Sequence, residues 1–287
     1  MMARIGGAEP GSPSAARAME RTDMSDRVRF DLGDDHVGVV TLDRPEILNA
    51  MDRATFEGLR EAAAVAAAEA AEGRCRAVLL IGAGRAFSAG LDIALFGEQA
   101  AGALPSDEWI DELQQAFTVY EDLPVPTVAA IRGVAIGAGC QLALACHLRV
   151  GAPDASLGLL EAKWALVPDL GGTVRLPRLV GLSRAIDLAT SARQIDAATA
   201  HSWGLLDAVL PDEGFEEAAR AYAARLAAGP TLAVGAIPGL MRNALAADRP
   251  SGLAAERQAQ LACLASEDFQ EAVRAAVERR DTNFSGR

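Results

Sequence analysis

The amino-acid sequence predicts an α/β fold with mostly parallel strands, followed by a helical C-terminal region. A unit of buried strand, glycine-rich turn and helix occurs twice between residues 76 and 145, which is typical of α/β proteins. Strand signals fade after residues 205–210, and helical patterns dominate residues 215–280. Hydrophobic residues make up 51 % of the 287-residue chain, which is ordinary for a protein with a real core.

The first elements are a hairpin and a long helix. Residues 27–32 and 36–42 alternate or run apolar around Gly33-Asp34-Asp35, which indicates a β-hairpin. A loop at residues 43–46 follows. Asp52 can cap an alanine-rich helix that runs to about residue 72 and ends at Gly73.

The two strand-turn-helix units come next. Residues 76–81 and 127–131 are short apolar runs, predicted to be buried strands, and small-residue loops follow them at 82–92 and 133–139. Ser106 is expected to cap a helix to about residue 123, which prolines 124 and 126 close off. A helix at 138–145 and a strand at 148–152 complete the second unit. In an α/β protein the ligand binds where such loops gather at strand ends.

The helical C-terminal region is punctuated at Gly229-Pro230 and at Pro250-Ser251-Gly252. At the other end, residues 1–24 are rich in Gly, Ala, Pro and Ser and lack the apolar stretch of a signal peptide, so they are predicted to be a mobile leader. Residues 25–225 are predicted to form the core, and residues 226–287 a helical region that packs on the body or on a neighbouring subunit.

Charge and cysteine usage exclude several classes of function. The formal net charge is −12 and the pI is near 4.8, so the basic footprint that nucleic acids or anionic membrane surfaces require is absent. No apolar run approaches the roughly 20 residues needed to cross a bilayer. The four cysteines form no C-x-x-C pair, which favours reduced thiols in a cytoplasmic protein and predicts no metal site.

The two small-residue loops are candidate sites for binding a negative charge. At the start of a helix or turn the backbone N–H groups are unpaired and face outward, where they favour negative charge. Two such donors on one oxygen form an oxyanion hole. Simple tight turns are the alternative interpretation. A dinucleotide site is disfavoured, since Gly137-Ala138-Gly139 lacks the third glycine of G-x-G-x-x-G. Ser88 does not fit the G-x-S-x-G of serine hydrolases.

Several segments, in order along the chain, resemble the signatures of the crotonase (enoyl-CoA hydratase/isomerase) superfamily from about residue 27 to the end. They are RPEILNAM at 44–51, GRAFSAGLD at 84–92, RGVAIGAGCQLA at 132–143, LLE at 159–161, LVPDLGGTVRLP at 166–177, and SEDFQEA, ERR and NFSG between 266 and 286. The resemblance implies a crotonase-like ββα spiral core with a C-terminal helical trimerisation region, an acyl-CoA substrate and a homotrimer or dimer of trimers. It implies no cofactor beyond the coenzyme A of the substrate.

The same resemblance assigns an oxyanion hole to the backbone N–H groups of Leu91 and Ala138. The family more often has glycine at position 138. Residues expected to line the substrate around these donors are Ala89, Gly90, Asp92 and Gly137. Arg44, Arg85 and Arg279 remain open candidates for the coenzyme A phosphates, because Ala94 stands where many relatives have lysine.

Gln141, Glu161 and Asp169 are the expected catalytic side chains. Hydratases of the family have glutamates at the positions of Gln141 and Glu161, and an amide cannot act as acid or base. The Glu161 and Asp169 pair is similar to dienoyl-CoA isomerases. We therefore expect double-bond isomerisation, with Glu161 and Asp169 moving the proton. Hydration, with Gln141 holding a water, and a non-catalytic acyl-CoA-binding protein remain alternatives. Residues 93–109 are expected to be mobile and to shape the acyl pocket.

Overall fold

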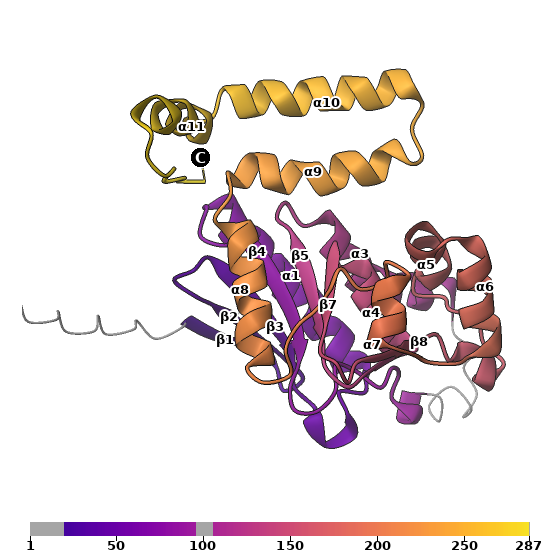
Figure 1. The fold of residues 1–287 in the computed structure, drawn as a ribbon. Coiled ribbons are helices and arrows are strands. Elements are labelled where there is room, and N and C mark those ends of the chain that lie inside the picture. The colour runs from indigo at the N-terminus through magenta and orange to yellow at the C-terminus, as the bar shows by residue number, and fades with distance from the viewer. Residues whose placement is uncertain (1–19, 96–105, 287) are drawn as a thin grey trace, which may run out of the picture.

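The computed structural model describes residues 20–95 and 106–286. Figure 1 shows a body of strands and helices with α9, α10 and α11 set together at one end. The α/β fold and the helical C-terminal region predicted from the sequence are confirmed.

A seven-stranded sheet forms the centre of the body, in the spatial order β1-β2-β3-β4-β5-β7-β10. Its strands are β1 (Glu20–Ser25), β2 (Val28–Leu32), β3 (Val37–Leu42), β4 (Ala77–Gly82), β5 (Thr127–Ile131), β7 (Leu148–Gly151) and β10 (Ala208–Val209). The first three strands are antiparallel, and every pairing from β3 to β10 is parallel. The predicted hairpin is therefore the antiparallel β2–β3 pair.

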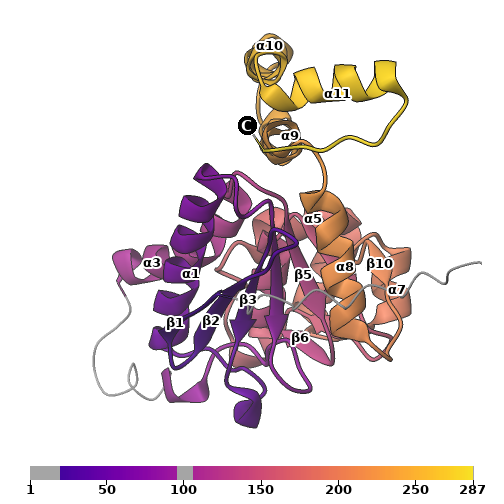
Figure 2. The same cartoon turned by 90° about the vertical axis from the view of Figure 1, so that its left-hand side faces the viewer.

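The sheet is buried on both faces, which explains why its central strands are continuous apolar runs. Alternate residues of β3 point to opposite sides: Val37 and Val39 pack in the cluster of α8 (Phe215–Ala227), while Val40 and Leu42 pack in the cluster of α1 (Arg53–Ala71). Figure 2 shows the sheet between α1 and α8.

The predicted helix starts are confirmed by their capping geometry. The Asp52 side chain accepts from the Thr55 N–H at 2.9 Å and begins α1, and Thr55 returns the bond in a capping box. Ser106 accepts from the Trp109 N–H at 3.2 Å and begins α3 (Asp107–Asp122). Both helices pack on the same face of the sheet.

A second, three-stranded sheet was not predicted. It consists of β6 (Val134–Ile136), β8 (Ser156–Gly158) and β9 (Ile195–Asp196). The segment predicted as a loop at 133–139 therefore contains a strand, and this strand exists because β8 pairs with it. The remaining elements of the body are η1 (Pro45–Ile47), α4 (Ala138–Ala145), η2 (Glu161–Trp164), α5 (Gly172–Val180), α6 (Leu182–Ser191) and α7 (Ala197–Ser202).

The C-terminal region consists of α9 (Thr231–Ala244), α10 (Arg249–Leu264) and α11 (Glu267–Glu278). The predicted interruption at Gly229-Pro230 separates α8 from α9. The second predicted interruption is displaced by a few residues: it lies at residues 245–248, between α9 and α10, while Pro250 lies in the first turn of α10, where the N–H that proline lacks is not needed. The expected boundary between residues 225 and 226 falls inside α8.

The predicted leader also differs from the structure at its end. Residues 20–24 belong to β1, which pairs with β2, while residues 1–19 lie outside the described part of the chain. The expectation for residues 93–109 falls largely on residues 96–105, which are also outside it.

Candidate active site

Two loops that are about 50 residues apart in the sequence lie against each other along the β6 edge of the small sheet. Ser88 forms a bridge with Ala135, in which the Ser88 N–H donates to the Val134 carbonyl at 3.0 Å and the Ile136 N–H donates to the Ser88 carbonyl at 3.1 Å. A Cβ atom at Gly90 would lie only 3.5 Å from the amide nitrogen of Ala138. The loops predicted to supply the two oxyanion donors are therefore in contact.

Neither predicted donor N–H has a hydrogen-bond partner among residues 20–95 and 106–286. Leu91 pairs with Met51 in a parallel bridge, which uses the carbonyl of Gly90 and the N–H of Asp92 but not the N–H of Leu91. Ala138 is the first residue of α4, so its N–H has no carbonyl one turn earlier in the helix. Two free donors on adjoining loops can bind one oxyanion.

Glycine is required at two points of this arrangement. Gly90 has φ 93°, and Gly137, which precedes α4, has φ 53° and ψ −125°; alanine is strained in both conformations. Ala138 itself is not among the residues with positive φ. Alanine in place of the family's usual glycine therefore keeps the donor without backbone strain.

Two buried polar residues that we did not predict hold the first loop in shape. The Asn49 amide donates to the carbonyls of Ala83 and Ala86 at 2.9 and 2.8 Å. The Ser88 hydroxyl donates to the Asn49 carbonyl at 2.8 Å and accepts from the Gly90 N–H at 3.1 Å. Both residues lie in segments that carry the family resemblance. An amide and a hydroxyl within largely apolar segments could have indicated these structural hydrogen bonds from the sequence.

Gln141, on α4, is almost completely buried and is a clamp between three groups. Its amide nitrogen donates to Glu161 Oε1 at 2.7 Å. Its amide oxygen accepts from the backbone N–H groups of Leu170 and Gly172 at 2.8 and 2.9 Å. These bonds fix which way the amide points, and they direct its N–H to the Glu161 carboxylate.

Glu161, the first residue of η2, lies beside the oxyanion loop. A Cβ atom at Gly137 would be 3.5 Å from Glu161 Oε1. The other oxygen, Oε2, is buried with no hydrogen-bond partner in the described structure. Burial raises the pKa of the Glu161 carboxyl, the Gln141 hydrogen bond opposes this, and the nearby Asp169 charge adds to the increase.

Asp169 lies in the turn that precedes α5 and is partly buried. Burial raises the pKa of its carboxyl above the usual value. Within the described ranges, no ion pair joins Asp169 or Glu161 to a cation. Two uncompensated carboxyls close to each other resist double ionisation, so one can hold a proton while the other accepts one.

The remaining predicted substrate-lining residues shape the loop by their contacts. Asp92 accepts from Arg44 Nη1 at 3.0 Å and from the Ala94 N–H at 3.0 Å, and the Ala89 N–H donates to the Leu48 carbonyl at 2.8 Å. The structure thus brings Leu91, Ala138, Gly90, Gly137, Gln141 and Glu161 together, while Asp92 points to Arg44.

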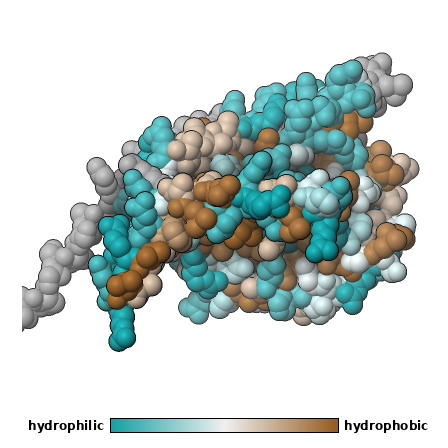
Figure 3. Space-filling view, turned by 90° about the horizontal axis from the view of Figure 1, so that it is seen from above, coloured by the Kyte–Doolittle hydropathy of each residue, from teal (hydrophilic) through white to brown (hydrophobic). Residues whose placement is uncertain are grey.

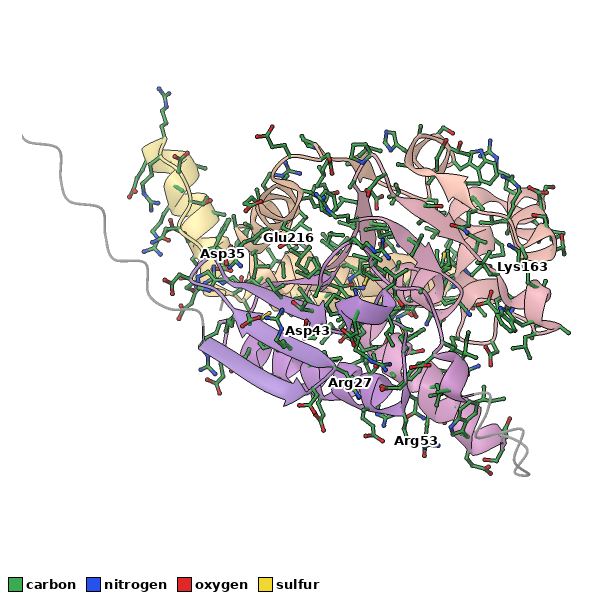
Figure 4. All side chains as sticks on the ribbon, turned by 90° about the horizontal axis from the view of Figure 1, so that it is seen from below. Arg27, Asp35, Asp43, Arg53, Lys163 and Glu216 are labelled. Atoms are coloured by element: carbon green, nitrogen blue, oxygen red, sulfur yellow. The ribbon has the colours of Figure 1, made fainter. Side chains whose placement is uncertain are left out.

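Among the candidate phosphate ligands, Arg44 is occupied by ion pairs with Asp52 and Asp92 and is mostly buried. Arg85 and Arg279 are exposed. Lys163, the only lysine of the chain, is two residues from Glu161 and lies at the outer edge of the molecule (Figure 4).

The described residues contain no group of three or more His, Cys, Asp or Glu side chains that could hold a metal ion. None of the helices in those residues has both the length and the apolar character to cross a membrane.

The chain is also similar to known proteins. A family model described as enoyl-CoA hydratase/isomerase matches residues 33–287. A Rhodobacter capsulatus protein named "Probable enoyl-CoA hydratase" is 37 % identical over 261 residues, which cover 91 % of this chain and 98 % of that protein. A fatty acid β-oxidation multifunctional protein of Cucumis sativus is 36 % identical over 199 residues, covering 69 % of this chain and 27 % of that protein.

The fold is matched by solved structures as well. The crystal structure of an enoyl-CoA hydratase from Bacillus anthracis superposes with a TM-score of 0.82 at 33 % identity, covering 91 % of this chain and all of that one.

Proposed function

Because this chain belongs to the enoyl-CoA hydratase/isomerase family of enzymes, as its crotonase-like segments indicated, we propose that it shifts a carbon–carbon double bond in an acyl-CoA thioester. The observation that carries the proposal is the bond from the Gln141 amide to Glu161 Oε1. A neutral amide stands where hydration would use a second carboxylate. Glu161 and Asp169 are then the groups left to move a proton.

The proposed reaction begins when the thioester oxygen accepts hydrogen bonds from the N–H groups of Leu91 and Ala138. Glu161 removes a proton from the α-carbon of a 3-enoyl thioester, and the electron pair of the C–H bond passes into a dienolate whose charge lies on that oxygen. Each donor contributes about 3–4 kcal/mol to such an intermediate. No step requires a metal or a redox cofactor.

The second half returns a proton to the γ-carbon, by Glu161 itself or by Asp169. The electron pair leaves the oxygen and the double bond forms between the α- and β-carbons. When Glu161 is the donor its carboxylate is restored; when Asp169 is the donor, the proton on Glu161 must pass to Asp169 before the next turnover. A buried carboxyl with a raised pKa suits both roles, because it takes a proton more readily than an exposed carboxylate and can return it as an acid. A 3,5-dienoyl thioester, which needs proton transfer at more distant carbons, would use both groups.

Hydration of a 2-enoyl thioester is the second candidate, and it is favoured by the names of the relatives. It requires one group to deprotonate a water while another delivers a proton. Gln141 is oriented by two backbone N–H groups and by Glu161, so little of its hydrogen-bonding capacity remains to orient a water. The third alternative is an acyl-CoA-binding protein without turnover. A buried Glu161 with no cation beside it among the described residues argues against this alternative, because proton transfer requires such a group and binding does not.

We propose in addition that the C-terminal helices make subunit contacts, as a homotrimer or a dimer of trimers would. Helices α9 and α10 bury only Thr231 in the single chain. Large apolar side chains remain exposed on α9–α11, among them Met241, Leu261 and Val277 at 69, 67 and 80 %. Figure 3, viewed onto this end, shows apolar residues among polar ones. A cytoplasmic location is also proposed, since all four cysteines are free thiols.

The proposal is tested by incubating the protein with 3-enoyl-, 3,5-dienoyl- and 2-enoyl-CoA esters in deuterated water and measuring products by mass spectrometry. A double-bond shift without added water supports the isomerase, and preference for the diene implicates Asp169. A product heavier by one water refutes isomerisation in favour of hydration. Glu161→Gln is the matched control: it should lower kcat about 10²–10⁴-fold and leave thioester binding nearly unchanged.

A further inference from the structure

The turn at residues 169–172, which carries Asp169, is held by side chains from three different helices. Gln114 of α3 donates to the Asp169 carbonyl at 2.5 Å. Gln141 of α4 accepts from two N–H groups of the turn. Arg175 of α5 donates to the Leu170 carbonyl at 2.7 Å. The position of this turn is therefore set by tertiary contacts and not by its own sequence alone.

Arg175 forms further polar contacts with α3. Besides Leu170 it contacts Thr118 Oγ1 at 3.2 Å and forms an ion pair with Glu121, both on α3. Its side chain is 10 % exposed and that of Glu121 is 19 % exposed, so the pair is largely removed from water. Burying a guanidinium charge is strongly destabilising unless its ion-pair and hydrogen-bond partners are present.

The turn is built around this guanidinium. Gly171 has φ 91°, and a Cβ atom there would lie 1.9 Å from Arg175 Nη1. Since neither the conformation nor the space allows a side chain, Gly171 leaves room for the arginine. Removing the arginine would leave a gap beside the turn and an unpaired carbonyl at Leu170.

A continuous chain of hydrogen bonds then leads from Arg175 to the reacting group. Arg175 holds the Leu170 carbonyl, and the Leu170 N–H holds the Gln141 oxygen at 2.8 Å. The Gln141 nitrogen in turn holds Glu161 Oε1 at 2.7 Å. A shift of the turn would therefore move Asp169 directly and Glu161 through the amide.

We propose that Arg175 is a positioning residue for both carboxylates, acting through the 169–172 turn and the Gln141 amide without touching the substrate. This inference rests on the proposed function, because the position of Glu161 and Asp169 matters to the rate only if they transfer the proton. Misplacing a reacting group by about 1 Å can lower a rate 10²-fold.

The test replaces Arg175 in the full-length protein and measures kcat and KM with the ester that the wild-type enzyme turns over. Arg175→Lys keeps a charge for Glu121, but one ammonium cannot reproduce the fork that spans Leu170, Thr118 and Glu121. We expect kcat to fall roughly 10–100-fold, with KM within about threefold of the wild-type value. Arg175→Met should lower kcat at least as much.

The matched control is Arg242→Met. Arg242, on α9, also pairs with Glu121 but does not contact the turn. Its kcat should stay within about threefold of the wild-type value. A loss equal to that of Arg175→Lys would mean that disturbing Glu121 is enough, and it would overturn the proposal.

Two readouts separate positioning from a general loss of structure. The acid limb of the kcat–pH profile should move to higher pH in Arg175→Lys, because a loosened Gln141 amide no longer stabilises the ionised Glu161. In a double-mutant cycle with Gln141→Met, the loss of kcat in the double variant should be smaller than the product of the two single losses. Independent effects would give the product itself. An unmoved limb with multiplicative losses refutes the positioning role.

Failure of the inference and failure of the proposed function are distinguishable. A wild-type enzyme that turns over none of the esters refutes the proposed function. Wild-type turnover together with an unchanged kcat in folded Arg175→Lys refutes only the role of Arg175. If Arg175→Met does not fold, the milder lysine variant and its pH profile decide.

Discussion

The contact between the two oxyanion loops can be tested by a single methyl group, in the variant Gly90→Ala. The added Cβ would lie 2.8 Å from the Ile136 carbonyl oxygen, while unstrained carbon–oxygen contacts begin near about 3.3 Å. The loops must therefore separate by roughly 0.5 Å or more. Alanine at φ 93° adds a backbone cost of about 1–3 kcal/mol.

The expected loss follows from what this separation moves. Gly90 precedes the Leu91 donor, and its Cβ would face the Ala138 donor at 3.5 Å, so the distance between the two N–H groups changes. Losing one donor to an oxyanion lowers kcat about 10²–10³-fold, or roughly 2.7–4 kcal/mol. We expect that loss in kcat for Gly90→Ala. KM should change much less, because the charge on the oxygen develops only in the transition state.

The assay is steady-state turnover of the ester identified above, with far-ultraviolet circular dichroism and thermal melting to show that the variant is folded. Gly252→Ala, in α10, is the control, since a Cβ atom there meets nothing within 4 Å. It should retain full activity. A folded Gly90→Ala enzyme with kcat within about threefold of the wild-type value would refute the assignment of the two N–H groups.

Three other variants test the charges and caps. Burial raises the pKa of the Glu161 carboxyl, so the folded protein becomes less stable as the pH rises through the folded-state pKa and the buried group ionises. Glu161→Gln should therefore melt at a higher temperature than wild type at pH 8 and at the same temperature at pH 4. Equal melting temperatures at pH 8 would contradict this. Burial lowers the pKa of His147, whose Nδ1 accepts from the Thr127 N–H. Wild type should therefore lose stability below about pH 6.5, and His147→Gln should lose less stability over the same range. Urea midpoints that change equally with pH in the two proteins between about pH 5 and 8 would contradict this. Asp52→Ala removes the cap of α1 together with the ion pairs of Asp52 to Arg27 and Arg44, and it should cost at least about 1 kcal/mol, a melting shift of about 2 °C or more. An unshifted melt would show that neither the cap nor these ion pairs stabilise the fold.

Elements whose stability is decided by nearby residues were predicted well from the sequence. The β2–β3 hairpin, α1 behind Asp52, α3 behind Ser106 and the β5 strand all appear within a residue or two of their expected bounds. Turn chemistry, caps and apolar periodicity act over a few residues, so the sequence displays them directly.

Three of the shortest strands were missed for the opposite reason. The β6, β8 and β9 strands have too few residues to show a period, and each exists only because a distant segment pairs with it. The same applies to the last residues of the predicted leader, which become β1 through pairing with β2.

At the site, the residue types and their order can be read directly from the amino-acid sequence: small residues at the two loops, an amide at 141, and carboxyls at 161 and 169. How these groups act on one another depends on the tertiary structure. It turned the Gln141 amide onto Glu161, left the Leu91 and Ala138 donors unpaired within the described chain, and tied the turn of Asp169 to Arg175. The Gln141–Glu161 bond joins residues 20 apart in the sequence, and Arg175 is held by Glu121, 54 residues away, so folding alone brings these groups within reach.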